Sequence, residues 1–121
     1  MEPKNSATKR IDWSMSIKLA NDKPELAKEL LDMLLHDLPK TRDLINQAFQ
    51  DSNFSLLHQL VHKLHGASCY CGVPFLKEVA TQFELKLKKN DKQHIASVLT
   101  ELNQEIELLI AEYQQNDYQN V

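Results

Sequence analysis

The sequence predicts an all-α fold, an antiparallel four-helix bundle with a short additional helix at its N-terminal end. Apolar residues recur at three- and four-residue steps along most of the chain, and no segment shows the alternation of a β-strand. The chain has 121 residues, 42% hydrophobic and 26% charged, which is an ordinary composition for one soluble domain. A single hydrophobic core is therefore expected.

Composition also excludes several classes of function. A formal net charge of -3 argues against a nucleic-acid-binding surface, which needs clustered Lys and Arg. With only two glycines, the chain has no glycine-rich loop of the kind that cradles nucleotide phosphates. No apolar run approaches the roughly 18 residues of a membrane span, and the start lacks the apolar centre of a signal peptide. We therefore expect a cytoplasmic location and no direct contact with nucleic acid or membrane.

Domain boundaries follow from the same patterns. Residues 1–11 are polar and aperiodic, typical of a flexible N-terminal arm or of the boundary of an excised piece. Helical periodicity spans residues 12–115, and residues 116–121 are expected to form a C-terminal tail.

Cap and proline signals place the first two helices. Asp12 is an N-cap candidate for a short helix that carries Trp13, and Asp22 precedes Pro24, which suits the first turn of the next helix. The apolar periodicity of this second helix continues across Pro39. This proline either kinks one long helix or separates two, and the single kinked helix is favoured.

Three further helices complete the bundle. The residues DSN at 51–53 are a turn and cap signal that opens a third helix near Phe54. Pro74 starts a fourth helix, which the polar run KKND at 88–91 closes. The last helix carries apolar residues at the spacing of a bundle seam: Ile95, Leu99, Leu102, Ile106, Leu109, Ile110 and Tyr113.

A helical wheel of the third helix separates a core face from a stripe of reactive side chains. The predicted core face holds Leu56, Leu57, Leu60, Val61, Leu64, Ala67, Ser68 and Cys71. A narrow stripe almost opposite holds His58, His62, His65 and Cys69. The three histidines are therefore expected to face away from the main core. Cys69 and Cys71 point to opposite sides of such a helix, so no disulfide between them is expected.

Both glycines of the chain lie beside this stripe. Glycine in a helix interior costs roughly 1 kcal/mol relative to alanine, so each position needs a reason. Gly66, one turn after His62, is interpreted as giving a partner close access to the imidazole, with close packing of a neighbouring helix as the alternative. Gly72 is interpreted as a C-cap at or near the end of the helix, with access as its alternative.

Three chemistries could use the stripe. A metal site would draw on His58, His62, His65 and Cys69, but these span roughly 16 Å of helix, too far for one ion. Hydrolysis with Cys69 as nucleophile would need an oxyanion hole and a cleft, which an exposed helix face does not supply. Phosphoryl acceptance needs an exposed imidazole on a rigid scaffold with a small neighbour, and both are present. From the stripe alone, ordinary solvated histidines remain the alternative.

The residues around His62 resemble a known family. "HKLHGAS", followed by Gly72, Leu76 and Glu84, resembles the signature of the histidine-containing phosphotransfer (HPt) domain: His, any residue, Leu, Lys, Gly and a small residue. Upstream, "LLDMLLHDLPKTRDLI" resembles the helix that precedes this motif, so the likeness covers roughly residues 12–115. "HKLHG" followed by "GVP" is similar to the C-terminal HPt domain of BarA/GacS-type hybrid sensor kinases of bacteria.

The resemblance implies roles for individual residues. His62 would be the phosphoacceptor, and Gly66 would give access to it. His65 stands where the family usually has a lysine beside the phosphoryl group, and an imidazole, unlike an ammonium, changes charge near neutral pH. His58, Lys63 and Cys69 would belong to the face on which a receiver domain docks.

The resemblance also implies partners. A receiver domain of a hybrid sensor kinase, holding an aspartyl phosphate and Mg²⁺, would donate the phosphoryl group, and a response regulator would accept it. The chain itself would bind no cofactor or metal, act as a monomer, and be a carrier without enzymatic activity. If it is excised from a hybrid sensor, the parent would be a histidine kinase of the inner membrane, with this part in the cytoplasm. The alternatives are a helical protein-interaction module without phosphotransfer and a metal-binding helical bundle.

Overall fold

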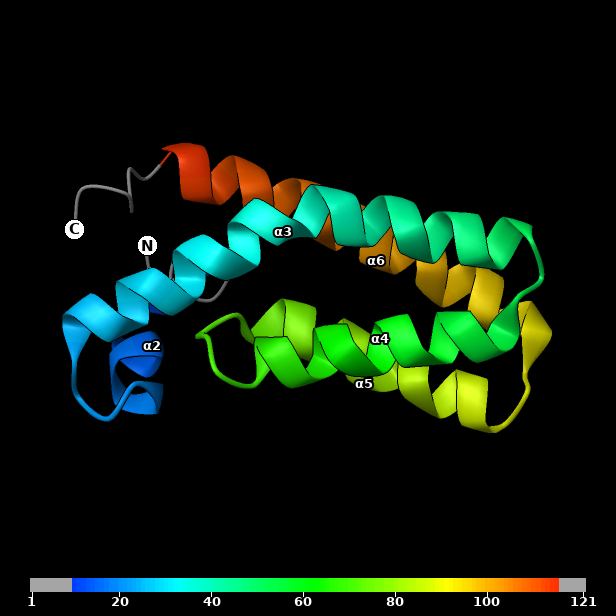
Figure 1. Ribbon diagram of the computed structural model, residues 1–121, viewed down its shortest axis with the longest axis horizontal. Coiled ribbons are helices and arrows are strands. Elements are labelled where there is room, and N and C mark those ends of the chain that lie inside the picture. Colours follow the sequence, from blue (N-terminus) through cyan, green and yellow to red (C-terminus); the bar gives the residue numbers. More distant parts are fainter. Residues whose placement is uncertain (1–9, 116–121) are drawn as a thin grey trace, which may run out of the picture.

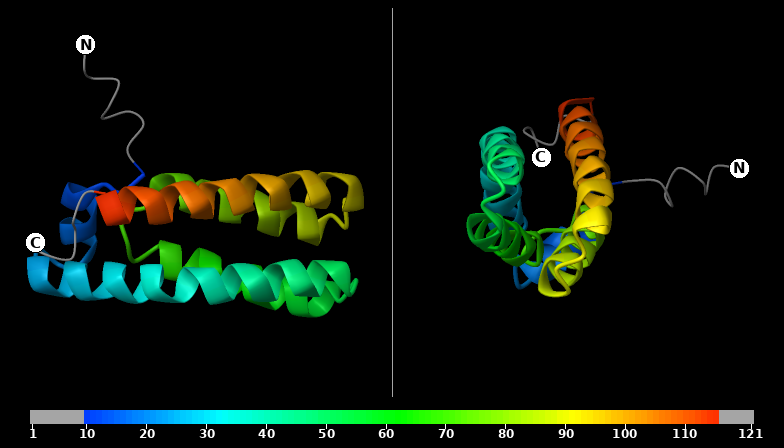
Figure 2. Two further views of the ribbon diagram at one scale, coloured as in Figure 1. Left: turned by 90° about the horizontal axis from the view of Figure 1, so that it is seen from above. Right: turned by 90° about the vertical axis from the view of Figure 1, so that its right-hand side faces the viewer.

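The computed structural model describes residues 10–115, which fold into helices and contain no strand. In chain order the helices are α2 (Trp13–Leu19), α3 (Pro24–Gln50), α4 (Phe54–Ser68), α5 (Pro74–Lys88) and α6 (Lys92–Gln115). The four longer helices run antiparallel to their neighbours in sequence, and α2 lies at one end, below the N-terminal half of α3 (Figure 1). Seen end-on, α3, α4, α5 and α6 follow one another around the bundle (Figure 2). The predicted all-α bundle with a short additional helix is confirmed.

The helices start where the sequence predicts them to start. The Asp12 carboxylate accepts a hydrogen bond of 3.0 Å from the backbone N–H of Met15 and so caps α2. Asn53 caps α4 in the same way, through the N–H of Leu56. Pro24 and Pro74 are the first residues of α3 and α5, where a missing N–H costs nothing.

Pro39 lies inside α3, so the expectation of one long helix instead of two is confirmed. A proline inside a helix removes one backbone hydrogen bond and crowds the carbonyl one turn earlier. Pro39 is exposed, whereas Leu38 before it and Ile45 after it are buried in the core. Burial of these two side chains holds both sides of the proline in the same helix.

Three helices end in turns that use a left-handed residue other than glycine. The φ angles are 61° at Asn21, 64° at Asp22, 55° at Ser52 and 59° at Asn90. After α3, the N–H of Ser52 bonds to the carbonyl of Phe49, and the next N–H reaches back to the carbonyl of Ala48. This pair of bonds is the Schellman pattern, in which glycine is the usual left-handed residue. Neither glycine of the chain is used for this purpose.

Gly72 does not cap a helix, and the prediction that it does is wrong. The helix α4 ends at Ser68, and Gly72 lies in the following loop, packed against α2. A Cβ at this position would lie 2.2 Å from the carbonyl oxygen of Asp12 and 2.7 Å from Oγ of Ser16. The Gly72 carbonyl accepts from the N–H of Asp12 at 2.7 Å, and its N–H donates to Oγ of Ser16 at 2.8 Å. Gly72 is therefore needed so that α2 can approach the loop closely.

The core runs the length of the bundle. Its fully buried larger side chains are Phe83, Ile11, Leu31, Leu38, Ile45, Leu57, Leu76, Ile95, Leu102, Ile106, Leu109 and Val61. Ile11 belongs to this core although the sequence pattern places it in the arm 1–11. Its N–H donates to the Glu112 carboxylate at 2.9 Å, and the N–H of Arg10 donates to the same group. Residues 1–9 and 116–121 lie outside the described part of the chain.

The core face of α4 is narrower than the wheel predicts. Leu57, Val61, Leu64 and Ser68 are buried along one line of the helix, and Cys71 is buried just beyond it. Leu60 is half-buried, whereas Leu56 is 39% exposed and Ala67 is exposed. These two predicted core positions lie to the side of the contact line between α4 and its neighbours.

Among residues 10–115, no helix is both long and apolar enough to cross a membrane.

Candidate functional site

The exposed imidazole of His62 lies against a buried carboxylate. The side chain of His62 is 75% exposed, near the middle of α4, while that of Glu84, on α5, is 10% exposed. Nδ1 of His62 is 2.5 Å from Oε2 of Glu84. The other ring nitrogen, Nε2, has no hydrogen-bond partner among the residues that the structure describes. One edge of the ring is thus held, and the other is open to solvent.

The ionisation of Glu84 decides which nitrogen of His62 carries the proton. Burial alone would raise the pKa of Glu84, but the hydrogen bond and charge of His62, followed by those of His65, outweigh it. The pKa of Glu84 therefore lies below its ordinary value, and the group is a carboxylate at neutral pH. A carboxylate can only accept, so the proton of a neutral His62 lies on Nδ1 and the lone pair on Nε2.

The same carboxylate also contacts His65, one turn further along α4. Nδ1 of His65 is 2.8 Å from Oε1 of Glu84. Its Nε2 is 3.2 Å from Oγ1 of Thr81, which also lies on α5. The side chain of His65 is only 27% exposed, so this member of the stripe is largely covered by α5. The histidines do face away from the main core, as predicted, but His65 is not simply solvated.

The structure places the other predicted site residues around His62. His58 is 3.9 Å from Oε2 of Glu84, at the outer limit of an ion pair. A Cβ on Gly66 would meet no heavy atom within 4 Å, so close packing of a neighbouring helix does not explain this glycine. Lys63 is exposed toward α3, and Cys69 is half-buried just after the end of α4.

The two thiols differ strongly in their surroundings. Cys71 is buried at the edge of the core, and this burial raises the pKa of its thiol to about 11. Cys69, two residues earlier, is partly open to solvent, and neither cysteine forms a disulfide.

Sequence reasoning named Glu84 only as part of a motif and missed its contact with the histidines. It also missed Thr81. The signal that could have found Glu84 is its position on α5, four residues after Ala80 and next to Phe83, both of which are fully buried. A carboxylate at the edge of a core stripe is rarely left unpaired, and the histidines of α4 are the nearest candidates.

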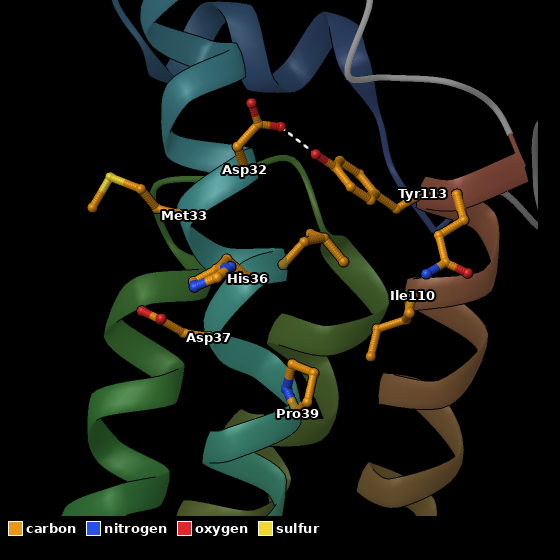
Figure 3. Close-up of a pocket in the computed structure, with 9 residues that line it drawn as sticks. Asp32, Met33, His36, Asp37, Pro39, Ile110 and Tyr113 are labelled. Carbon is orange, nitrogen blue, oxygen red and sulfur yellow. Dashed lines mark hydrogen bonds between the residues drawn. The ribbon is translucent and has the colours of Figure 1, made fainter.

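A separate hollow lies between α3 and α6, away from the histidines of α4. It has a volume of about 720 Å³ and is lined by residues such as Met33, Pro39 and Ile110 (Figure 3). The Tyr113 hydroxyl crosses it and donates a hydrogen bond to the carboxylate of Asp32. Burial and this carboxylate raise the pKa of Tyr113 to about 12.

Among residues 10–115, no cluster of His, Cys, Asp and Glu has the arrangement of a metal site.

The fold and the site together define a class of protein. The candidate nucleophile stands on the outside of a helical bundle, with one ring nitrogen held by a carboxylate and a side chain that is 75% exposed. Such a site presents a reactive atom to another macromolecule and does not enclose a small substrate. This is the arrangement of a histidine phosphocarrier.

Comparison with known proteins agrees. A family model described as "Hpt domain" matches residues 29–112. The chain is 35% identical over 83 residues to the signal transduction histidine-protein kinase BarA of Escherichia coli (strain K12), covering 69% of this chain and 9% of BarA. It is 38% identical over 106 residues to the sensor histidine kinase GacS of Pseudomonas protegens, covering 88% of this chain and 12% of GacS. The chain thus spans only a small part of the length of these relatives.

Solved structures show the same fold. The HPT domain of an Hpt sensor hybrid histidine kinase from Shewanella superimposes with a TM-score of 0.83 at 33% identity, covering 91% of this chain and 95% of that domain. The histidine-containing phosphotransfer protein B (HptB) of Pseudomonas aeruginosa PAO1 has a TM-score of 0.79 at 17% identity, covering 94% of this chain and 98% of HptB, and shows likeness of fold alone. The chain belongs to the Hpt domain family, the histidine-containing phosphotransfer domains. Domains of this family carry phosphoryl groups in phosphorelays between receiver domains, and they are not enzymes.

Proposed function

We propose that His62 is the phosphoacceptor of this chain and that Nε2 is the atom that takes the phosphoryl group. The observation that carries this proposal is the contact of 2.5 Å between Nδ1 of His62 and Glu84, which leaves an exposed Nε2. No other histidine of α4 combines such exposure with a held Nδ1. His58 has only a distant ion-pair contact, and His65 has both nitrogens engaged.

The chemistry follows from the tautomer. The lone pair of Nε2 attacks phosphorus in line, and the bond from phosphorus to the leaving oxygen of the donor breaks. The proton stays on Nδ1, so the ring gains positive charge as the new bond forms. The Glu84 carboxylate accepts from Nδ1 throughout and offsets that charge, as the buried carboxylate of a Ser-His-Asp triad does for its imidazole.

The partner supplies the remaining electrostatics in this proposal. The donor is the aspartyl phosphate of a receiver domain, and the Mg²⁺ and basic groups that stabilise the transferring phosphoryl group belong to that receiver. The chain contributes a positioned nucleophile and binds no cofactor of its own. A second receiver, that of a response regulator, takes the phosphoryl group from His62.

Surface features next to His62 support receiver docking. Gly66 leaves space beside the imidazole, and from there the surface continues over Lys63 and the exposed Tyr70. A groove of about 500 Å³ between α3 and α4 adjoins this area and is lined by apolar residues that include Leu60 and Ala67. Exposed apolar residues beside a reactive side chain suit a transient protein interface. His58 and Cys69 extend the same face along the other side of His62.

The relatives suggest the larger setting. Because BarA and GacS are sensor kinases that match this chain over a small part of their length, we propose that it serves as the phosphotransfer domain of such a system. It would act as a monomer in the cytoplasm, and a parent kinase would supply the phosphoryl group through its receiver.

Phosphotransfer from a receiver tests the assignment. A receiver domain phosphorylated with labelled phosphate is mixed with the natural chain, with His62→Gln and with the control His36→Gln, which alters an exposed histidine of α3 outside the proposed docking face. We expect label on the natural chain and on His36→Gln, none on His62→Gln, and nearly unchanged thermal stability for His62→Gln because the side chain is exposed. Full labelling of His62→Gln would overturn the assignment. Receiver binding without transfer to any form would indicate an interaction module instead.

A further inference from the structure

His65 is held between two groups of α5. Its Nδ1 is 2.8 Å from Oε1 of Glu84, and its Nε2 is 3.2 Å from Oγ1 of Thr81. Both ring nitrogens therefore face a protein oxygen. The ring is mostly covered, so water replaces these partners less readily than it would on the open surface.

Both partners act as acceptors. Glu84 is a carboxylate, since its histidine contacts hold its pKa below the ordinary value against the effect of burial. The Thr81 hydroxyl has a single hydrogen, which it donates to the carbonyl of Lys77 at 2.8 Å. Its oxygen is thus left to accept from His65. A neutral imidazole has one N–H and an imidazolium has two, so only the imidazolium donates to both partners at once.

The shared carboxylate links His65 to His62. Oε1 of Glu84 contacts Nδ1 of His65, and Oε2 contacts Nδ1 of His62. A lone carboxylate beside His62 would favour the protonated imidazole, which has no lone pair with which to attack phosphorus. A cation already paired with the same carboxylate opposes this second protonation, because like charges disfavour each other. It also occupies Oε1, so that Oε2 stays directed at His62.

We propose that His65 is a positioning residue that, as an imidazolium held by Glu84 and Thr81, keeps His62 neutral with its proton on Nδ1 and its Nε2 nucleophilic near neutral pH. This inference rests on the proposed role of His62 and adds a reason for an imidazole at position 65. The positive charge that keeps His62 neutral comes from His65 of the chain itself, before any receiver docks.

Other titratable groups lie near these two rings. On α4 they are His58, 3.9 Å from Oε2 of Glu84, and the thiol of Cys69, one turn after His65. On α5, the ammonium of Lys77 lies one turn before Thr81, and Glu84 supplies the negative charge. Because the three imidazoles of α4 lie near one carboxylate, the measurement follows each ring by its own signal.

NMR titration of single rings provides the first test. The pH midpoint of the His62 ring is measured in the natural chain, in His65→Gln and in His65→Lys. Removing the cation in His65→Gln should move the His62 midpoint upward by about 0.5 pH unit or more, while a permanent cation in His65→Lys should keep it at or below the natural value. Equal midpoints in these two variants would overturn the proposal.

Thr81 offers a second, independent test. Thr81→Val removes the acceptor of the His65 Nε2–H with little change of shape, and Thr81→Ser keeps it. Thr81→Val should therefore make His65 lose its proton at lower pH and raise the His62 midpoint, and Thr81→Ser should do neither. Unmoved rings in Thr81→Val would show that this contact does not hold the charge.

Phosphorylation by phosphoramidate links the titration to reactivity without a receiver. In this reaction Nε2 bonds to phosphorus, the P–N bond of the reagent breaks, and ammonia leaves with the proton of the reagent. A midpoint raised by 0.5 unit should make His65→Gln about 3-fold slower than the natural chain at acidic pH, with the difference disappearing at pH above 8. The rate of His65→Lys should follow the natural chain. A pH-independent loss in His65→Gln would indicate a merely structural role, whereas phosphorylation of His62→Gln at the natural rate would refute the proposed function itself.

Discussion

Gly72 and Gly66 should respond to alanine in opposite directions. In Gly72→Ala the new Cβ would lie 2.2 Å from the backbone oxygen of Asp12, so α2 must move by roughly 1 Å to restore ordinary van der Waals separation. That movement strains two hydrogen bonds, from the N–H of Asp12 to Gly72 and from Gly72 to Ser16. With about 1 kcal/mol for each bond and about 1–3 kcal/mol for overpacking, we expect a loss of roughly 3–5 kcal/mol.

The matched variant is Gly66→Ala. Its Cβ meets no atom within 4 Å, so only the helix propensity changes, and stability should rise by up to ~1 kcal/mol. Urea unfolding followed by far-ultraviolet circular dichroism measures both, and the Tm of Gly72→Ala should fall on the order of 10 °C. Free energies of unfolding for Gly72→Ala within about 0.5 kcal/mol of the natural chain would refute the reasoning about the contact with α2.

Two further predictions concern turns and ionisation. Ser52→Gly should stabilise the chain by up to ~1 kcal/mol in the same unfolding assay because Ser52 adopts φ 55°; Asn90→Gly, the control, should gain less because asparagine tolerates this conformation. A gain in Asn90→Gly equal to that in Ser52→Gly would contradict this. The pKa of Tyr113 is raised to about 12, so the folded state binds the phenolic proton more tightly than the unfolded state. The associated stability is complete below about pH 10 and is lost as pH rises toward 12. Spectrophotometric titration should show one late phenolate that is absent in Tyr113→Phe, and a full titration below pH 11 would exclude the hydrogen bond to Asp32.

Most of the fold could be predicted because the signals were local. Asp12, Pro24, Asn53 and Pro74 mark helix starts through their own side chains and backbone, and the structure uses each of them in this way. The continuation of α3 through Pro39 needed more than local propensity, because buried side chains on both sides of the proline, Leu38 before it and Ile45 after it, decide it. In the sequence, this tertiary effect was visible only as apolar residues that keep their helical spacing across Pro39.

The candidate site was predictable only on its own helix. The stripe of histidines follows from the periodicity of α4, whereas the partner carboxylate lies 22 residues away on α5. Their meeting depends on the register of two packed helices, which no local pattern specifies. Gly72 was misinterpreted for the same reason. A glycine is needed there because α2 packs against the loop, and Ser16 of α2 lies 56 residues earlier in the chain.

Because the two thiols are unequally buried, selective modification of one of them can be used to measure receiver docking. Near neutral pH a soluble thiol reagent should modify Cys69 and leave Cys71 unmodified, because Cys71 is buried and its pKa is raised to about 11. Cys69 follows His62 by seven residues, roughly 10 Å along the helix direction. A fluorophore attached there would sit at the border of the receiver-facing surface without any engineered cysteine. In a separate experiment on the unlabelled chain, slower modification of Cys69 in the presence of a receiver would report receiver binding independently of phosphoryl transfer.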